Sequence, residues 1–426
     1  MRTNQIFSRI LSIVCLLGLL AACAPAATSA PVDTGAPAAT DAPAAQPAGC
    51  EIKMGLLLSL TGDLGDLGQG QLPAVEMATE EINAAGGPLG CKVVVVSEDD
   101  RSSPEGAVAG AKKLVFTDGA ITLIGLNSTG ITALLDFART NKVPVLTHYG
   151  GTVKLDTEGG DYVFRTVLSD SFAGIGSAKF LTDMGFKTAA NLYENSESPQ
   201  SNAVTMKREY EKMGGKVVVD VAFNPGQSSY QAELKKVFDA KPEIVLLAAG
   251  QDSGATILKE WYRGNYGGQW LLGSDLAASE FVAQVGEETM KGMYGQTSGD
   301  DVGSLSFKRY EELWKQKTGQ AVAPWASNLY DSFILEALAI EIGGAATGEA
   351  INANMKKVTT GEVKCISYEE CVKALREGKT IAYQGVSGPL QFNKYNNVVA
   401  PYTMLITEGD HWKVFKFYSA DNFKLE

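Results

Sequence analysis

The chain has 426 residues, of which 20% are charged, and a formal net charge of −12 at pH 7. This acidic balance argues against nucleic acid and anionic lipid surfaces as partners. The length leaves room for an N-terminal export region and about two folded domains.

The N-terminus has the layout of an export signal. Two basic residues, Arg2 and Arg9, precede an apolar run over 10–20 that is too short to cross a bilayer. Cys23 follows Leu-Ala-Ala, which resembles a bacterial lipobox. We predict a signal peptide over 1–22 and a lipid on Cys23, which places the protein outside the cytoplasm on a bacterial membrane. The alternative is an ordinary signal peptide with a chance cysteine.

Residues 23–49 are expected to form the lipid anchor and a disordered linker. They consist almost entirely of Ala, Pro, Thr, Ser, Gly and Asp. A segment of that composition lacks the apolar side chains needed to form a core.

Four cysteines remain in the folded part, an even number in an oxidising compartment. Cys50 and Cys91 each precede an apolar run, so they can bridge if the two runs are neighbouring parallel strands. Cys365 and Cys371 are then expected to pair locally. A zinc site is the weaker alternative, because the chain has no Cys-x-x-Cys and only two histidines.

The folded part alternates short apolar runs with amphipathic stretches, which predicts parallel sheets covered by helices on both faces. Ten strands are many for one sheet, so the sequence predicts an α/β fold with two doubly wound lobes. The expected strands are 52–58, 92–97, 121–125, 143–147, 162–165, 187–193, 216–221, 243–248, 269–273 and 292–296. The expected helices are 72–85, 104–117, 128–141, 171–184, 199–214, 229–240, 252–263, 302–318 and 327–343.

Catalytic motifs fail in this sequence. The glycine-rich run over 62–70 has Pro73 where a dinucleotide motif needs Gly, and the Gly-Lys-Thr at 378–380 lacks the first glycine of a phosphate loop. Ser128 has one residue too many before it for a nucleophile elbow. His148 is the remaining catalytic candidate, since it falls just after a predicted strand. We therefore expect no enzymatic activity, no cofactor and no metal.

Several segments in order resemble the solute-binding lipoproteins of branched-chain amino-acid (Leu/Ile/Val-binding) ABC transporters, which have the type I periplasmic-binding fold. The resemblance covers residues 51 to about 410. It rests on the segments 52–62, 78–87, 162–166, 323–331 and 388–392.

The resemblance implies two lobes joined by a three-strand hinge, with crossovers near 166–169, 296–299 and 385–389. The first lobe is expected to comprise 50–167 plus 298–386. The second is expected to comprise 168–297 plus 387–426.

The resemblance also implies a function: capture of an amino acid, of branched-chain type or a related small zwitterion, by closure of the lobes. The partners would be a pair of ABC permease subunits with cytoplasmic ATPases, and the receptor itself would be a monomer. One alternative is a ligand sensor for a membrane signalling receptor. Another is an importer receptor for an amide or an aromatic carboxylate. An extracytoplasmic hydrolase is disfavoured by the failed motifs.

Three residues match the family positions that hold the two charged ends of an amino acid. Ser128 and Thr129 are expected to bind the carboxylate, and Asp275 the ammonium group. The alternative for all three is helix capping, which is common for these residue types.

A second family segment, a turn containing Thr, corresponds to residues 149–152. Counted from the neighbouring segments, the family Thr falls on Gly151, and Thr152 is one residue away. Backbone contact by Tyr149, Gly150 and Gly151 is expected, with the Thr152 hydroxyl as a further candidate.

The chain departs from the family where the wall of the pocket is expected. Leu67, Ser198 and Gly250 stand where Leu/Ile/Val binders carry aromatic residues, which favours a larger or more polar ligand than leucine. Trp325 is the best-placed replacement aromatic by family position, and Gln251 is a polar candidate. Further candidates are Tyr193, Asn195 and Tyr330.

Overall fold

The structure, a computed structural model, describes residues 49–298, 300, 302–399 and 401–419. The expected signal peptide over 1–22, the acylated Cys23 and all of the linker except residue 49 lie outside the described residues. Within the described part, no helix combines the length and the apolar character that a membrane span requires.

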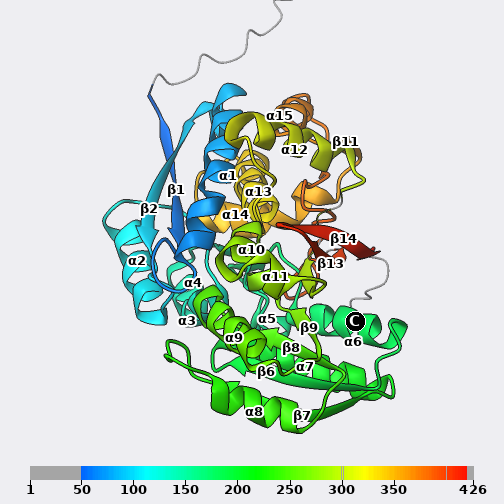
Figure 1. Ribbon diagram of the computed structural model, residues 1–426. Coiled ribbons are helices and arrows are strands. Elements are labelled where there is room, and N and C mark those ends of the chain that lie inside the picture. The colour runs from blue at the N-terminus through cyan, green and yellow to red at the C-terminus, as the bar shows by residue number, and fades with distance from the viewer. Residues whose placement is uncertain (1–48, 299, 301, 400, 420–426) are drawn as a thin grey trace, which may run out of the picture. The chain divides into compact units, whose positions relative to one another are not determined.

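The first lobe is built on a five-stranded parallel sheet in the order β2-β1-β3-β4-β5. Its strands β1 and β2 are labelled in Figure 1. Except for the edge strand β2, its strands are largely buried on both faces, which is why they read as continuous apolar runs in the sequence. Its strands are β1 (Glu51–Leu58), β2 (Lys92–Asp99), β3 (Leu123–Ile124), β4 (Val145–Thr147) and β5 (Val163–Arg165).

The helices of the first lobe come from two distant parts of the chain. In the same core as β1, α1 (Gly65–Ala84) packs against α13 (Ala326–Gly343). The others are α2 (Pro104–Phe116), α3 (Ser128–Ala133), α4 (Leu135–Asn141), α5 (Leu155–Glu158), α12 (Leu305–Thr318), α14 (Gly348–Asn354) and α15 (Tyr368–Arg376). Short 3-10 helices are η1 (Pro88–Gly90) and η3 (Met355–Thr359), and a small sheet pairs β11 (Val363–Cys365) with β12 (Ile381–Tyr383).

Helix α1 begins seven residues before the start predicted at 72. Pro73, the second residue of the predicted helix, lies inside α1. The early start depends on Gly68, because a Cβ there would lie 1.9 Å from the carbonyl oxygen of Ser59. The glycine-rich run therefore brings the first turn of α1 against the end of β1 instead of forming a loop.

The second lobe has a seven-stranded sheet in the order β14-β13-β10-β9-β8-β6-β7 (Figure 1). Its strands are β6 (Thr188–Glu194), β7 (Lys216–Phe223), β8 (Ile244–Ala248), β9 (Gln269–Leu272), β10 (Tyr294–Ser298), β13 (Tyr402–Glu408) and β14 (His411–Tyr418). The last two strands are antiparallel and were not predicted. Its helices are α6 (Asp170–Asp183), α7 (Glu197–Lys212), α8 (Gln231–Asp239), α9 (Gln251–Gly264), η2 (Ser274–Leu276), α10 (Ser279–Val285) and α11 (Glu287–Met290).

The chain passes between the two lobes after β5, after β10 and before β13. The third passage differs from the position expected near 385–389. Leu390 and Val398 are buried in the core of the first lobe, and Asn397 bridges to Arg165 of β5. We therefore propose that the boundary between the lobes falls after Val398.

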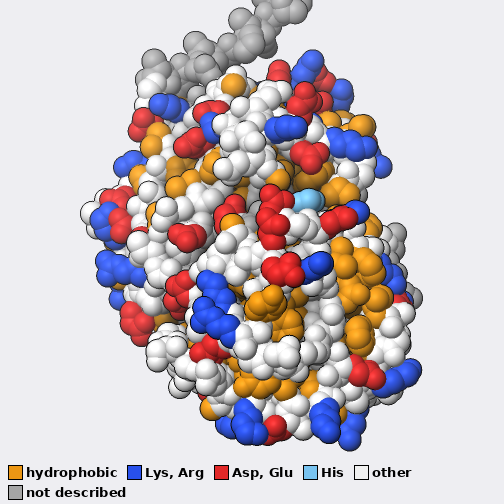
Figure 2. All heavy atoms as spheres, in the orientation of Figure 1, with side chains coloured by type: hydrophobic (Ala, Val, Ile, Leu, Met, Phe, Trp, Pro, Cys, Tyr) orange, Lys and Arg blue, Asp and Glu red, His pale blue; other side chains and the backbone are white. Residues whose placement is uncertain are grey.

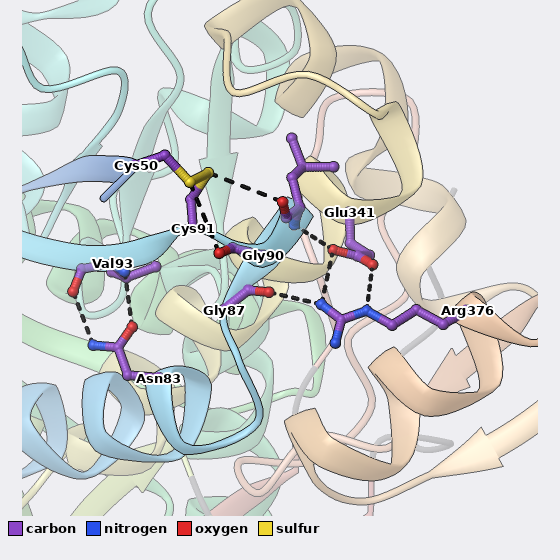
Figure 3. The surroundings of a disulfide bond; sticks show 9 residues. Cys50, Asn83, Gly87, Gly90, Cys91, Val93, Glu341 and Arg376 are labelled. Atoms are coloured by element: carbon purple, nitrogen blue, oxygen red, sulfur yellow. Dashed lines mark hydrogen bonds and ion pairs between the residues drawn. A yellow bond between two sulfur atoms is a disulfide. The ribbon is translucent and has the colours of Figure 1, made fainter. Parts of the chain in front are cut away.

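Two disulfides lie in the first lobe (Figure 3 shows the first). Cys50 is bonded to Cys91 with 4.9 Å between their Cα atoms, directly before the paired starts of β1 and β2. Nearby, the Asn83 side chain exchanges two hydrogen bonds of 2.8 and 2.9 Å with the backbone of Val93. The other disulfide joins Cys365 of β11 to Cys371 of α15.

Charged side chains of both signs are interspersed over the face of the molecule in Figure 2. Basic side chains do not gather there into one broad field. This face therefore lacks the basic surface that a nucleic-acid partner needs.

Candidate ligand-binding site

Two adjoining cavities lie where residues of both lobes meet, and they share Ser198, Pro199 and Asp275. The first is also lined by Tyr149, Gly151, Val167, Leu168, Asp170, Asn202, Ala248, Ala249, Gly273, Ser274, Trp325 and Tyr402. The second is also lined by Asp63, Leu64, Ser102, Asn127, Ser128, Thr129, Glu194, Ser196 and Gly250. Many of these residues directly follow parallel strands, which is where ligands bind in open α/β sheets.

Ser128 and Thr129 line the second cavity from the start of α3. The cap of α3 is Asn127, whose Oδ1 accepts a hydrogen bond of 2.7 Å from the backbone N–H of Gly130. Capping is therefore not the role of Ser128. Its hydroxyl oxygen accepts a hydrogen bond of 3.2 Å from the backbone N–H of Thr152.

The turn over 149–152 reaches the first cavity through Tyr149 and Gly151. The Tyr149 hydroxyl lies 3.2 Å from the Ser59 hydroxyl, and its ring centroid is 6.1 Å from that of Trp325. Gly151 contributes backbone atoms to the cavity wall. The turn thus supplies one aromatic wall and an open stretch of backbone to the cavity.

Asp275 lies in η2 and borders both cavities. It does not cap the following helix, because α10 begins at Ser279 with Ala278 as its N-cap. Burial, with the negative charge of Glu194, raises the pKa of Asp275 to about 7. A cation beside it would restore the ionised form.

Asp170 is a cavity residue that the sequence analysis did not identify. It is the first residue of α6 and its side chain is 7% exposed. Burial raises the pKa of Asp170 to about 8, against the opposing effect of Arg165. Among the described residues, its Oδ2 has no hydrogen-bond partner.

Gly151 makes room for the Asp170 carboxylate. A Cβ at position 151 would lie 2.2 Å from Asp170 Oδ1, so any other residue there would require the carboxylate to move. The backbone N–H of Asp170 also donates a hydrogen bond of 2.7 Å to the Gly151 carbonyl oxygen. The carboxylate therefore occupies the space that a side chain at position 151 would fill.

Arg165 is the nearest cation to Asp170, but its direct contacts are elsewhere. Its guanidinium is fully buried and lies 2.5 Å from Asp156 Oδ1. It also donates to the carbonyl oxygens of Gly151 and Thr152, at 3.2 and 2.9 Å. The ion pair of Arg165 is thus with Asp156, and it lowers the pKa of Asp170 only from a distance.

The described residues that line the two cavities include four acids and no Lys, Arg or His. Glu194 accepts hydrogen bonds of 3.1 Å from the Gly250 backbone and from the Ser196 hydroxyl. Burial raises the pKa of Glu194, and Asp63 adds to this effect. The ionisable carboxyls of the site are therefore not balanced by a basic side chain among the described lining residues.

The structure does not bring several predicted residues to either cavity. Leu67, in the first turn of α1, is buried in the core of the first lobe, and the Gly150 amide donates a hydrogen bond to the Thr147 hydroxyl. Thr152 is fully buried and binds Glu197 of the second lobe. Gln251 also lines neither cavity, and its side chain donates a hydrogen bond to the Asp275 carbonyl oxygen. The other predicted residues outside both cavities are Tyr193, Asn195 and Tyr330.

His148 does not have the surroundings of a catalytic base. It is fully buried, and its Nε2 lies 2.8 Å from Gln71 Oε1. Burial lowers the pKa of His148 to about 3, so the imidazole is neutral. Within the part of the chain that the structure describes, no three His, Cys, Asp or Glu side chains are grouped to hold a metal ion.

A two-lobed α/β fold with a polar cleft between the lobes defines the class of periplasmic binding proteins. The family model described as periplasmic binding protein matches residues 51–406, and the chain belongs to that family. The chain is 25% identical over 318 residues to the leucine-, isoleucine-, valine-, threonine- and alanine-binding protein of Pseudomonas aeruginosa, covering 73% of this chain and 85% of that one.

Solved structures share the fold. A leucine-binding protein from Thermotoga maritima has a TM-score of 0.77 at 21% identity, covering 87% of this chain and 100% of that one. A solute-binding protein of an ABC transporter from R. palustris, in complex with benzoate, has a TM-score of 0.73 at 19% identity, covering 87% and 97%.

Proposed function

We propose that this protein is the extracytoplasmic, lipid-anchored receptor of an ABC importer, and that it captures an amino acid in the cleft between its lobes. The observation that carries the proposal is the position of Asp275. It borders both cavities, opposite Ser128 and Thr129 of the first lobe, in a chain of the periplasmic binding protein family. The relative from P. aeruginosa, by its name, binds five amino acids.

The proposed binding mode uses both lobes. The hydroxyls of Ser128 and Thr129 bind the ligand carboxylate, and the Asp275 carboxylate binds the ammonium group. Such charge-assisted hydrogen bonds gain strength in a cleft from which water is excluded. A ligand that contacts both lobes favours the closed arrangement, which gives closure a thermodynamic cause.

A non-amino-acid ligand remains the second candidate. The similar protein from R. palustris was crystallised with benzoate, a carboxylate without an ammonium group. In that case the hydroxyls of Ser128 and Thr129 would keep their role, and Asp275 would not contact the ligand.

The test is the thermal stability of the purified full chain against α-amino acids, amides, aromatic carboxylates and polyamines. A ligand that binds only the folded state raises the melting temperature by mass action. Stabilisation by α-amino acids supports the proposal. Stabilisation only by compounds without an ammonium group would contradict the role of Asp275, and an unresponsive protein would contradict the receptor function. Release from membranes by Cys23→Ser tests the lipid anchor.

A further inference from the structure

Asp170 places a carboxylate in the cleft that the proposed amino-acid contacts do not use. The ligand ammonium group needs one acid, and Asp275 serves for that. Asp170 lines the first cavity, whereas Ser128 and Thr129 line the second, with Asp275 between them. A ligand bound by its two charged ends at Asp275 and Ser128 would extend its side chain into the first cavity, beside Asp170.

The Asp170 side chain is set for a cation rather than for a structural ion pair. It is more than nine-tenths buried, and Oδ2 is without a hydrogen-bond partner among the described residues. The one nearby guanidinium, on Arg165, is in direct contact with Asp156 and two carbonyl oxygens. Burying an ionised carboxylate without a partner of opposite charge costs free energy, and a cation in direct contact reduces that cost.

We infer that the cleft beside Asp170 binds a second cationic group, so that the preferred ligand is an amino acid with a positively charged side chain. This inference rests on the proposed function, and it narrows the substrate class from amino acids in general to cationic ones. The described lining residues include four acids and no basic side chain, so no cation of the cleft walls competes with the ligand for these carboxyls.

Proton release on binding is a direct consequence. The groups that act on Asp170 are Arg165, Asp156, Asp275 and the Ser198 hydroxyl of α7, which hydrogen-bonds to the carboxyl, with the Tyr402 hydroxyl on β13. Burial outweighs the pKa-lowering effects of Arg165 and Ser198. Because burial raises its pKa to about 8, much of the Asp170 carboxyl is protonated at neutral pH in the absence of ligand. An incoming ammonium or guanidinium group lowers that pKa, and the proton leaves to the buffer.

The experiment is calorimetric titration of the purified full chain at pH 8 with matched ligand pairs that differ in side-chain charge. The pairs are 2,4-diaminobutyrate with norvaline, ornithine with norleucine, and arginine with citrulline. In at least one pair, the cationic member is expected to bind about 10-fold tighter or more, as for a desolvated charge pair. Repeating the titration in buffers of different ionisation enthalpy measures the released proton.

Variants separate the inference from simple misfolding. Asp170→Asn keeps the shape of the side chain and is expected to reduce the preference to about 3-fold or less, while the neutral member still binds. Asp239→Asn, on exposed α8 and outside both cavities, is the matched control and should keep the full preference.

The outcomes distinguish the inference from the proposed function. Equal binding of charged and neutral members, or an unchanged preference in Asp170→Asn, would overturn the inference and leave an amino-acid receptor. Tighter binding of citrulline than of arginine would also overturn it, because it would show a protonated Asp170 acting as a donor to an amide. If no amino acid of either kind bound, both proposals would fail.

Discussion

The Thr152 hydroxyl of the first lobe donates a hydrogen bond to the Glu197 carboxylate of the second lobe, with 2.9 Å between Oγ1 and Oε1. Thr152 follows β4 and is fully buried, whereas Glu197 begins α7. This contact joins the lobes directly without lining either cavity. Under the proposed binding mode, this contact would act on the balance between open and closed arrangements of the lobes rather than on the ligand.

Thr152→Val, which removes this hydrogen bond and keeps the shape of the side chain, should weaken binding of every ligand by a similar factor. A net loss of about 1.5 kcal/mol for a hydrogen bond to a charged group corresponds to about 10-fold in the apparent dissociation constant. Calorimetric titration with two unrelated ligands measures it. Thr182→Val removes a hydroxyl that binds within α6, and should leave affinity unchanged. A loss confined to one ligand would place Thr152 in the ligand contact itself.

Asp275→Asn should weaken binding of α-amino acids by about 10-fold or more, because the ammonium group loses a desolvated charge partner. Compounds with a carboxylate and no ammonium group should bind as before. Asp252→Asn, on the exposed side of α9, is the matched control. Equal affinities of the Asp275→Asn variant and the unaltered protein for amino acids would remove Asp275 from the site.

The cleft carboxyls make the stability of the ligand-free protein depend on pH. Asp170 and Asp275 have folded-state pKa values of about 8 and about 7, above the value of about 4 for an unfolded Asp. The folded state therefore binds more protons between pH 4 and 8, and the contribution of these groups to stability falls as pH rises through that window.

Asp170→Asn should accordingly raise the melting temperature of the ligand-free protein at pH 8 and change it little at pH 5. Asp156→Asn should lower the melting temperature at both pH values, because it leaves the buried Arg165 without its ion-pair partner. Thermal denaturation at the two pH values checks both variants. A lower melting temperature of Asp170→Asn at pH 8 would show that Asp170 stabilises the fold through Arg165.

The two disulfides should differ in their contribution to stability. They join residues 41 and 6 positions apart. In the chain-entropy model, these loops correspond to about 4 and about 2 kcal/mol. Urea unfolding of the Cys50→Ser/Cys91→Ser and Cys365→Ser/Cys371→Ser variants measures the two values, after peptide mapping without reductant has established the pairs. Equal losses would show that strain or residual structure, rather than loop length, sets the contributions.

The ten strands up to residue 298 were all predictable, with ends within two residues in most cases. Buried parallel strands carry apolar side chains on both faces, so each reads as a continuous run. The sequence analysis missed the hairpin of β13 and β14 because its second strand lacks such a run. Most of β14 is exposed and contains Lys413 and Lys416, so the stretch lacks the apolar run of a core strand.

The site was predictable only in part. Ser128, Thr129, Ser198 and Asp275 fall after strands that the sequence reveals, and they line the cavities. Asp170 was missed because an acid at the start of a helix is common for helix stability alone. Its burial depends on Gly151, a long-range relation that a single sequence does not display.

The bond between Cys50 and Cys91 also determines how the first lobe bears mechanical load. Cys50 stands at the start of β1, an inner strand, and Cys91 at the start of β2 at the sheet edge. A pull on the chain ahead of Cys50 passes through sulfur into both strands at once. The eight paired positions of β1 and β2 then move as one unit, and the force cannot peel one strand from the other starting at that end.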